Sequence, residues 1–212
     1  MTDDLIARLS DDLKPVAPAA LLGRVAGFVL AGLLVSGFLM LIWLGLRPDF
    51  AEAVGTSVFW IKFGYTLLLG LVGLRAVERL GRPGASARST LFGAIAIAAV
   101  LAVVAVAAYA GAPAEARHAM VVGSSALLCP FYIVALSLPF LVAGGALMRR
   151  LAPTNLWLAG AAVGFMAGAL GAWVYSFHCT EEGLPFLAIW YSLGILVMAG
   201  IGTLLGRTWL RW

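Results

Sequence analysis

Six long apolar runs divide this chain and constrain its fold more than any other feature of the sequence. Each run has about 20 residues, the length that an α-helix needs to cross the hydrocarbon core of a bilayer. Short connections separate the runs and carry most of the charge. We therefore predict an all-α polytopic membrane protein, a bundle of six transmembrane helices at residues 25–46, 56–74, 91–109, 127–147, 156–177 and 185–205.

The composition excludes a water-soluble enzyme. Of the 212 residues, 63% are hydrophobic and only 11% are charged, and a soluble domain of this size cannot bury so much apolar surface. The predicted spans contain no acidic residue, and the chain lacks HExxH and GxSxG motifs, so we expect no enzymatic activity. The 14 Lys and Arg residues are spread over several connections, which argues against direct binding of nucleic acid.

The positions of the cations predict the orientation in the membrane. The connections on one side carry only Arg47 and Arg117, together with five acidic residues. By the positive-inside rule, that side is periplasmic and both termini are cytoplasmic. The cytoplasmic side then holds Arg8, Lys14, Arg24, Arg75, Arg79, Arg82, Arg88, Arg149, Arg150, Arg207 and Arg211.

Residues 1–24 form a separate cytoplasmic segment that precedes the 25–212 membrane domain. Its first part has the periodicity of a short amphipathic helix that ends before Pro15. Four aspartates on the polar side argue against an anchor on anionic lipid and favour the groove of a protein partner, although membrane lipid stays the alternative. The predicted partner-binding residues are Leu5, Ile6, Leu9, Asp12 and Leu13.

The chain has two cysteines, and the topology places both near the periplasmic side. Cys129 begins the fourth span and Cys179 follows the fifth, so the thiols could form a disulfide or bind a soft cation transiently. His178, Glu181 and Glu182 are candidates for further metal ligands or for tuning a thiolate. The alternative is a buried Cys129 and an unrelated loop thiol, and we predict no permanently bound cofactor.

Lys62 is the only charged residue inside a predicted span. It lies about two turns below the periplasmic boundary, and burial of a charge at that depth is costly. It could reach outward to water, pair with Glu181 or Glu182, or take part in sensing or ion passage.

The fifth and sixth spans carry residues that suit helix packing. Gly160, Gly164 and Gly168 recur at intervals of four, which lets helix backbones approach closely. Trp190 and Tyr191 are expected to pack in the bundle or to lie in an aromatic belt. Such glycine faces suit packing within one chain or between chains, so the sequence leaves the oligomeric state open.

Taken together, these motifs resemble the NrsF family of integral membrane anti-sigma factors. The most specific parts are the sequence Asp-Leu-Lys-Pro-Val before the first span and the sequence Trp-Tyr-Ser-Leu-Gly in the last. The other residues that carry the resemblance are Asp4, Leu5, Ile6, Leu9, Phe59, Trp60, Lys62, Tyr65, Cys129, Pro139, the Arg-Arg-Leu-Ala-Pro run at 149–153, Tyr175, His178, Cys179, Glu181, Arg211 and Trp212.

The resemblance implies a protein that holds an ECF-type sigma factor at the inner membrane and releases it under heavy-metal or oxidative stress. It also implies that Cys129 and Cys179 are the paired sensor thiols. The competing interpretation is a small metal-handling membrane protein or transporter that uses Lys62, the thiols and Glu181. A transport pathway usually has several polar residues or broken helices at the midplane, which these spans lack.

Overall fold

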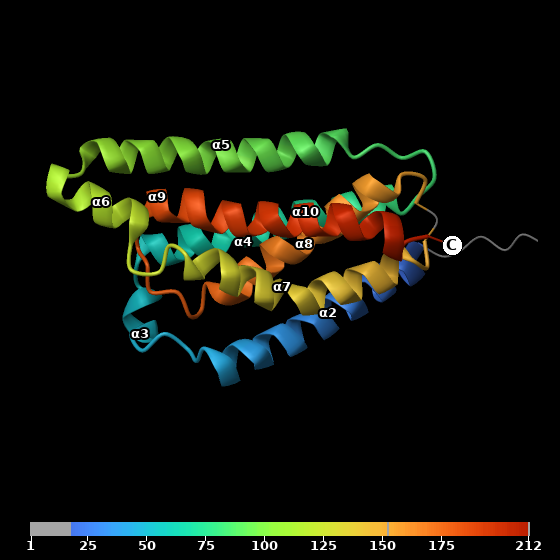
Figure 1. Ribbon diagram of the computed structural model, residues 1–212, viewed down its shortest axis with the longest axis horizontal. Helices are drawn as coiled ribbons and strands as arrows, with labels where there is room; N and C mark the ends of the chain where they lie inside the picture. The colour runs from blue at the N-terminus through green and yellow to red at the C-terminus, as the bar shows by residue number, and fades with distance from the viewer. Residues whose placement is uncertain (1–17, 152, 212) are drawn as a thin grey trace, which may run out of the picture.

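The computed structural model describes residues 18–151 and 153–211, and every regular element in these ranges is a helix (Figure 1). The predicted partner-binding residues at positions 5–13 lie outside the described residues. The elements are α2 (Pro18–Trp43), α3 (Phe50–Ala53), α4 (Ser57–Leu80), α5 (Arg88–Gly111), α6 (Ala114–Val122), α7 (Leu128–Met148), α8 (Leu156–Tyr175), α9 (Leu184–Phe186), the π-helix η1 (Leu187–Tyr191) and α10 (Ser192–Trp209).

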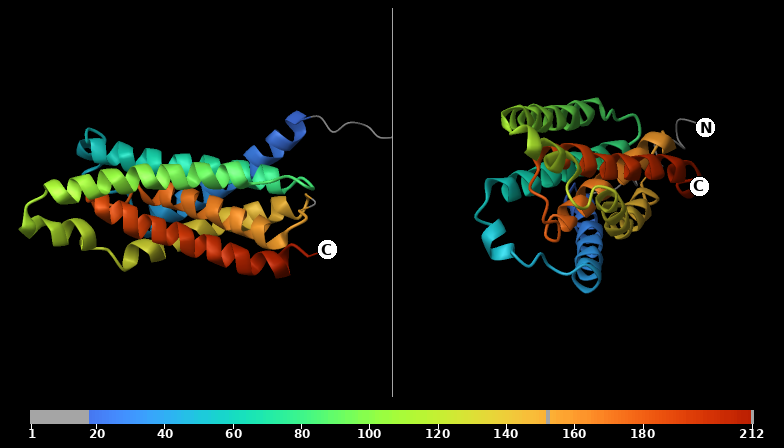
Figure 2. Two further views of the ribbon diagram at one scale, coloured as in Figure 1. Left: turned by 90° about the horizontal axis from the view of Figure 1, so that it is seen from above. Right: turned by 60° about the vertical axis from the view of Figure 1, so that its left-hand side comes forward.

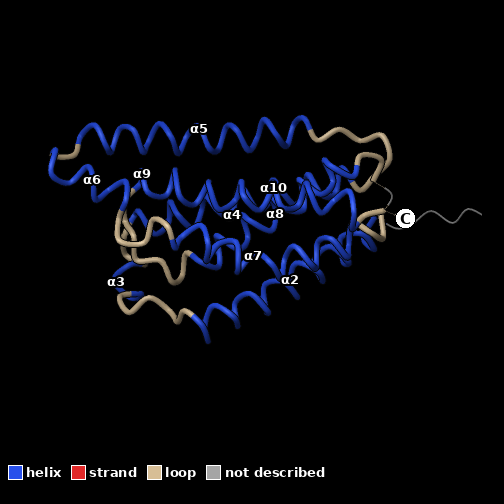
Figure 3. The backbone as a smooth tube through the Cα atoms, in the orientation of Figure 1, coloured by secondary structure: helices blue, strands red, loops and turns tan. Residues whose placement is uncertain are grey.

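The prediction of six helices long and apolar enough to span a membrane is confirmed. Six helices are long and apolar enough to cross a membrane: Gly23–Trp43 within α2, α4, α5, α7, α8 and the continuous segment Leu184–Trp209. We call the end of the bundle where α2 begins and α10 finishes the terminal end. The opposite end, with α3, α6 and residues 176–183, is the loop end; Figure 3 shows the loops gathered at these two ends.

Some helix boundaries differ from the prediction. Helix α2 begins at Pro18, seven residues before the predicted start of the first span. Helix α4 continues six residues past its apolar run, and Arg75 and Arg79 are therefore helical. Arginine is a good helix former, and the ion pair from Arg75 to Glu78 one turn later supports this extension.

Local signals explain where two of the spans begin. The Thr56 hydroxyl accepts a hydrogen bond from the Phe59 amide at the start of α4, and Asn155 caps α8 in the same way. Helix α7 contains Pro139, which cannot donate to the carbonyl one turn earlier. In the same turn the Ser36 hydroxyl of α2 donates to the Leu136 carbonyl at 2.8 Å, a hydrogen bond that joins α2 to α7.

Helix α8 is the centre of the bundle and packs on α10, α4 and α7. The predicted packing glycines lie at its contact with α10. A Cβ atom at Gly160 would collide with the Gly202 carbonyl, and one at Gly164 would collide with the Met198 carbonyl. At Gly168 a Cβ atom would lie 2.9 Å from the Ile195 Cα atom. The absence of side chains therefore sets the distance between the two helices.

Replacement of Gly202 by valine should destabilise the bundle. The new side chain would meet the Gly160 carbonyl and would lie 2.7 Å from the Gly164 Cα atom, so the helices would have to separate. We expect a loss of about 1–3 kcal/mol in unfolding free energy, measured by thermal unfolding in detergent. Gly200→Val is the matched control on the same helix, because a Cβ atom there meets nothing within 4 Å. Equal losses in both variants would contradict this account.

Helix α5 lies apart from the other spans. It is the least buried of the six and runs along one side of the bundle, beside α4 (Figure 2). Its exposed surface is almost entirely apolar and includes Leu91, Phe92, Val100 and Val103. Such a surface is suited to contact with lipid tails.

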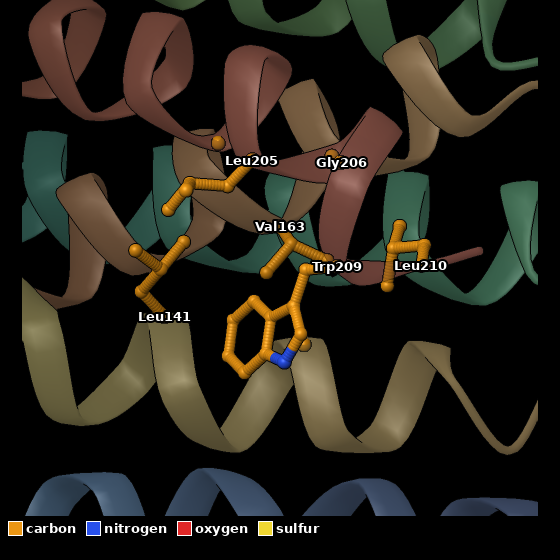
Figure 4. A pocket seen from close by; sticks show the side chains of 9 residues that line it. Leu141, Val163, Leu205, Gly206, Trp209 and Leu210 are labelled. Atoms are coloured by element: carbon orange, nitrogen blue, oxygen red, sulfur yellow. The ribbon is translucent and has the colours of Figure 1, made fainter.

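The terminal end of the bundle interior is closed by Trp209. Its indole extends from α10 toward α7, with Leu141, Val163 and Leu210 around it (Figure 4). The space left between these side chains is about 10 Å³, roughly the volume that one water molecule requires. This part of the bundle has no room for a small-molecule ligand.

Candidate thiol site

The two cysteines lie at the loop end, inside the bundle. Cys129 is in the first turn of α7, and Cys179 follows α8. Both thiols are buried, with 0% and 3% of the residue surface exposed, and they are not bridged. Both residues belong to the same buried core of the bundle. The fold thus brings together two thiols that are 50 positions apart in the sequence.

Two buried tyrosines complete the surroundings of the thiols. The Tyr175 carbonyl at the end of α8 accepts the Cys179 amide at 3.1 Å, and the Tyr175 ring lies 5.7 Å from the ring of Tyr191 in the last segment. Tyr191 is the last residue of η1, a π-helical turn that widens the helix locally. Its hydroxyl is fully buried and has no hydrogen-bond partner among the groups of residues 18–151 and 153–211. The predicted packing residue Tyr191 therefore presents a polar atom at the thiol site.

Lys62 is buried beside the same site, with 2% of its surface exposed. Among the described residues it forms no ion pair with the carboxylate of Glu181 or Glu182, one of the alternatives that the sequence left open. The Lys62 ammonium donates instead to the main-chain carbonyls of Cys179 at 3.1 Å and Glu181 at 2.6 Å, and it lies 5.8 Å from the centre of the Tyr191 ring. The 176–183 loop does fold over the bundle. It contacts Lys62 through its backbone carbonyls and not through its carboxylates.

Arg47 also holds the 176–183 loop, through hydrogen bonds to two of its backbone carbonyls. Its guanidinium donates to the Cys179 carbonyl at 3.4 Å, and its backbone amide donates to the Phe177 carbonyl at 3.1 Å. Asp49 accepts two further bonds from the guanidinium, at 2.6 and 2.8 Å. This bidentate pair raises the pKa of Arg47 and lowers the pKa of Asp49. Two cations thus converge on the carbonyl of Cys179.

Glu181 connects the two cysteine segments. Its Oε1 atom accepts four hydrogen bonds, from the amides and hydroxyls of Ser124 and Ser125, at 2.7–3.1 Å. The Ser125 carbonyl in turn accepts the Cys129 amide at 2.8 Å. Gly123 must lack a side chain here, because a Cβ atom would collide with the Glu181 carboxylate, and its φ of 54° suits glycine. The residue two positions after Cys179 is therefore bound to the turn that precedes Cys129.

The hydrogen bonds that Glu181 accepts from Ser124 and Ser125 determine how this contact depends on pH. Burial raises the pKa of Glu181, but the four bonds from Ser124 and Ser125 outweigh it and leave the pKa below its usual range. A lowered folded-state pKa means that the stabilisation is complete above about pH 4.3, the ordinary glutamate value, and is lost only as the pH falls through the lowered value. The connection is therefore intact at neutral pH.

Glu181→Gln should open the thiol site. The substitution removes the charge that strengthens the four bonds, and each charge-assisted bond is worth about 1.5–3 kcal/mol. In the Cys129→Ser background, we expect Cys179 to react with a maleimide at least about fivefold faster, because labelling of a buried thiol requires local opening. Glu182→Gln is the matched control, because it removes the same charge from the adjacent, exposed carboxylate, which is 3.7 Å from its nearest cation and so beyond hydrogen-bond distance. A labelling rate unchanged by Glu181→Gln would contradict the role of these bonds.

The candidate metal ligands do not gather around the thiols. The Glu181 carboxylate faces Ser124 and Ser125, the Glu182 carboxylate faces Arg47, and the His178 Nδ1 atom lies 3.0 Å from the Gly45 carbonyl. Within the part of the chain that the structure describes, no three His, Cys, Asp or Glu side chains are placed to hold a metal ion. A cation at this site would therefore depend on the two thiolates.

Sequence reasoning did not identify all the residues of the site. It placed Arg47 in a connection without a role, and it did not single out Ser124 and Ser125. The one signal available was that Arg47 is a rare cation on a side dominated by acids. The serine pair directly before the fourth span gave no comparable signal.

Trp190 donates its indole N–H to the Val121 carbonyl at 2.9 Å. It therefore joins the last span to α6, an element that was not predicted.

Comparison with known proteins gives matches over nearly the full length. The family NrsF, described as "Negative regulator of sigma F", matches residues 9–212. The chain is 41% identical over 217 residues to the anti-sigma-F factor NrsF of Caulobacter vibrioides, covering 100% of this chain and 99% of that protein. It is 38% identical over 218 residues to the probable anti-sigma-F factor NrsF of Azospira oryzae, with the same coverage. No solved structure matches this chain significantly.

Proposed function

Since this chain belongs to the NrsF family of negative regulators of sigma F, we propose that it binds an ECF-type sigma factor at the bacterial inner membrane and releases it when its thiols react. The full-length similarity to an anti-sigma-F factor is the observation that carries the binding function. The six apolar helices support a location in the membrane. The buried pair of thiols supports the sensing function.

The distribution of charge supports a cytoplasmic location for both termini. The terminal end holds the arginines that follow α4, precede α5, follow α7 and close α10. The loop end holds Arg47 and Arg117, of which Arg47 is neutralised by Asp49. In this orientation the thiols face the periplasm, where oxidants and metal ions arrive, and the sigma factor binds at the opposite face.

The helices that carry the thiols suggest how a signal crosses the membrane. A metal ion or oxidant changes the thiols at the loop end of α7 and α8, and the packing of α7, α8 and α10 then shifts at the terminal end. These three helices are in close contact at their glycines. Closely packed helices transmit the displacement of one helix to the next better than loosely packed helices do. A coupling free energy of about 1–3 kcal/mol would lower sigma-factor affinity roughly 5- to 150-fold.

Deletion of the gene tests the negative regulation. Transcripts that depend on the sigma factor should rise in the deletion strain without any stress, and a plasmid copy of the gene should return them to the basal level. Reporter fusions at residues 85 and 180, one active only in the cytoplasm and one active only in the periplasm, check the orientation in the same strain. Unchanged transcripts in the deletion strain would contradict the proposed function.

A further inference from the structure

A long groove runs between α5 and α4, along the helices that lie side by side. Near the terminal end it has a volume of about 890 Å³. It is apolar toward the middle of the bundle, where Leu68, Leu71 and Val72 line it, and polar toward the terminal end. The polar lining consists of Arg75, Glu78, Arg79, Arg82, Ser86, Ser89 and Thr90. Figure 1 shows α5 at the edge of the bundle.

The polar part of the groove has an excess of positive charge. Three arginines line it against one acid, Glu78, which already pairs with Arg75 at 3.1 Å. Arg79 donates only to the Ser86 carbonyl, at 3.4 Å, and Arg82 forms no ion pair with any residue in the described ranges. Both side chains are exposed. Two guanidinium groups are thus available to an anion at the mouth of the groove.

The apolar part continues toward the loop end. Leu68 also lines a second pocket of about 500 Å³ between the same two helices, with Trp60, Gly64, Ile97 and Val100. The groove therefore combines a cationic mouth with an apolar channel that follows the direction of the spans. This arrangement has the polarity of one leaflet of a bilayer.

We propose that this groove binds an anionic phospholipid, with the phosphate at Arg79 and Arg82 and an acyl chain along Leu68, Leu71 and Val72. Guanidinium groups bind phosphate through paired, charge-assisted hydrogen bonds, and basic pockets between transmembrane helices are known sites for acidic headgroups. A soluble protein partner would match the arginines but cannot occupy the apolar channel at membrane depth. The lipid satisfies both parts, and this inference does not depend on the proposed function.

Competition between two lipids tests the site. Native mass spectrometry of the full-length protein, released from micelles with equal amounts of phosphatidylglycerol and phosphatidylcholine, should show preferential retention of phosphatidylglycerol. Both lipids carry a phosphate, but only phosphatidylglycerol has a net negative charge, because choline compensates the phosphate in phosphatidylcholine. Each arginine near a net negative headgroup contributes about fivefold, so Arg79→Gln with Arg82→Gln should reduce that preference roughly 25-fold. Arg207→Gln with Arg211→Gln is the matched control, because it removes equal charge from the same end, outside the groove.

A second variant tests the apolar channel and leaves the arginines in place. Gly93 lines the groove, and a Cβ atom there would only touch Val72 at 3.8–4.0 Å, so Gly93→Leu should fold normally and fill the channel. We expect it to reduce phosphatidylglycerol retention as well. The site would be overturned if the unmodified protein showed no preference for phosphatidylglycerol, or if the Arg207 and Arg211 control variant lost as much of that preference as the Arg79 and Arg82 variant. It would also be overturned if the Arg79 and Arg82 variant retained lipid normally but lost sigma-factor binding.

Discussion

In the protein that carries both Cys129→Ser and Cys179→Ser, we expect the sigma factor to remain bound when a thiol-reactive metal ion or an oxidant is added. Both thiols are buried at one site, and serine keeps their shape while removing their affinity for soft cations and their redox chemistry. Binding before stress should stay normal, because the substitutions lie at the loop end. A reporter that depends on the sigma factor should therefore lose the roughly 5- to 150-fold response expected from the coupling.

The single substitutions make this test more specific. If the two thiols act as a pair, Cys129→Ser and Cys179→Ser should each abolish the response as fully as the double variant does. Ser137→Ala is a control for changes in the interior of α7, because Ser137 is buried but its hydroxyl donates only to the Ile133 carbonyl of the same helix. A normal response in the double variant would show that the thiols are not the sensor.

Substitution of the N-terminal segment should give the largest loss of binding. Leu5→Asp with Leu9→Asp places two charges on the apolar side of the predicted amphipathic helix. Burial of two leucines in a partner groove contributes about 3 kcal/mol or more, so sigma-factor affinity should fall at least about 100-fold. The measurement is co-purification of the sigma factor with the tagged variant, together with its amount in the membrane fraction.

The same segment offers a matched control. Ala7 falls on the opposite side of the helical pattern, so Ala7→Asp adds a charge without placing it on the apolar side. It should retain the sigma factor at close to the normal level. If the Leu5 and Leu9 variant also retained the sigma factor, the segment would have no part in binding, and the arginines after α4 would become the next surface to test.

The sequence was sufficient to predict the spans because the physical requirement is local. A bilayer offers no hydrogen-bond partners to the backbone, so an apolar run of about 20 residues has no alternative to a helix. The helix ends were less predictable, as α4 shows, because the helix continues beyond the apolar run through residues with high helix propensity. The short helices α3 and α6 in the connections have no strong periodic pattern and were not predicted.

The interior of the thiol site could be predicted only in part. The topology brought Cys129 and Cys179 to one end of the bundle, but their neighbours depend on how the 176–183 loop folds. Lys62 contacts the carbonyls of that loop, and every residue has a carbonyl, so no sequence pattern could identify this contact. Tyr191 reaches the thiol site from the end of η1, and such a single π-helical turn has no reliable sequence signal.

The most direct test of the account is to isolate the tagged protein from gently solubilised native membranes, before and after exposure to a thiol-reactive metal ion, and to identify its partners by mass spectrometry. We expect an ECF-type sigma factor that is present before exposure and depleted afterwards. Absence of a sigma factor from both samples would contradict the binding function. A sigma factor that is retained equally in both would contradict release through the thiols.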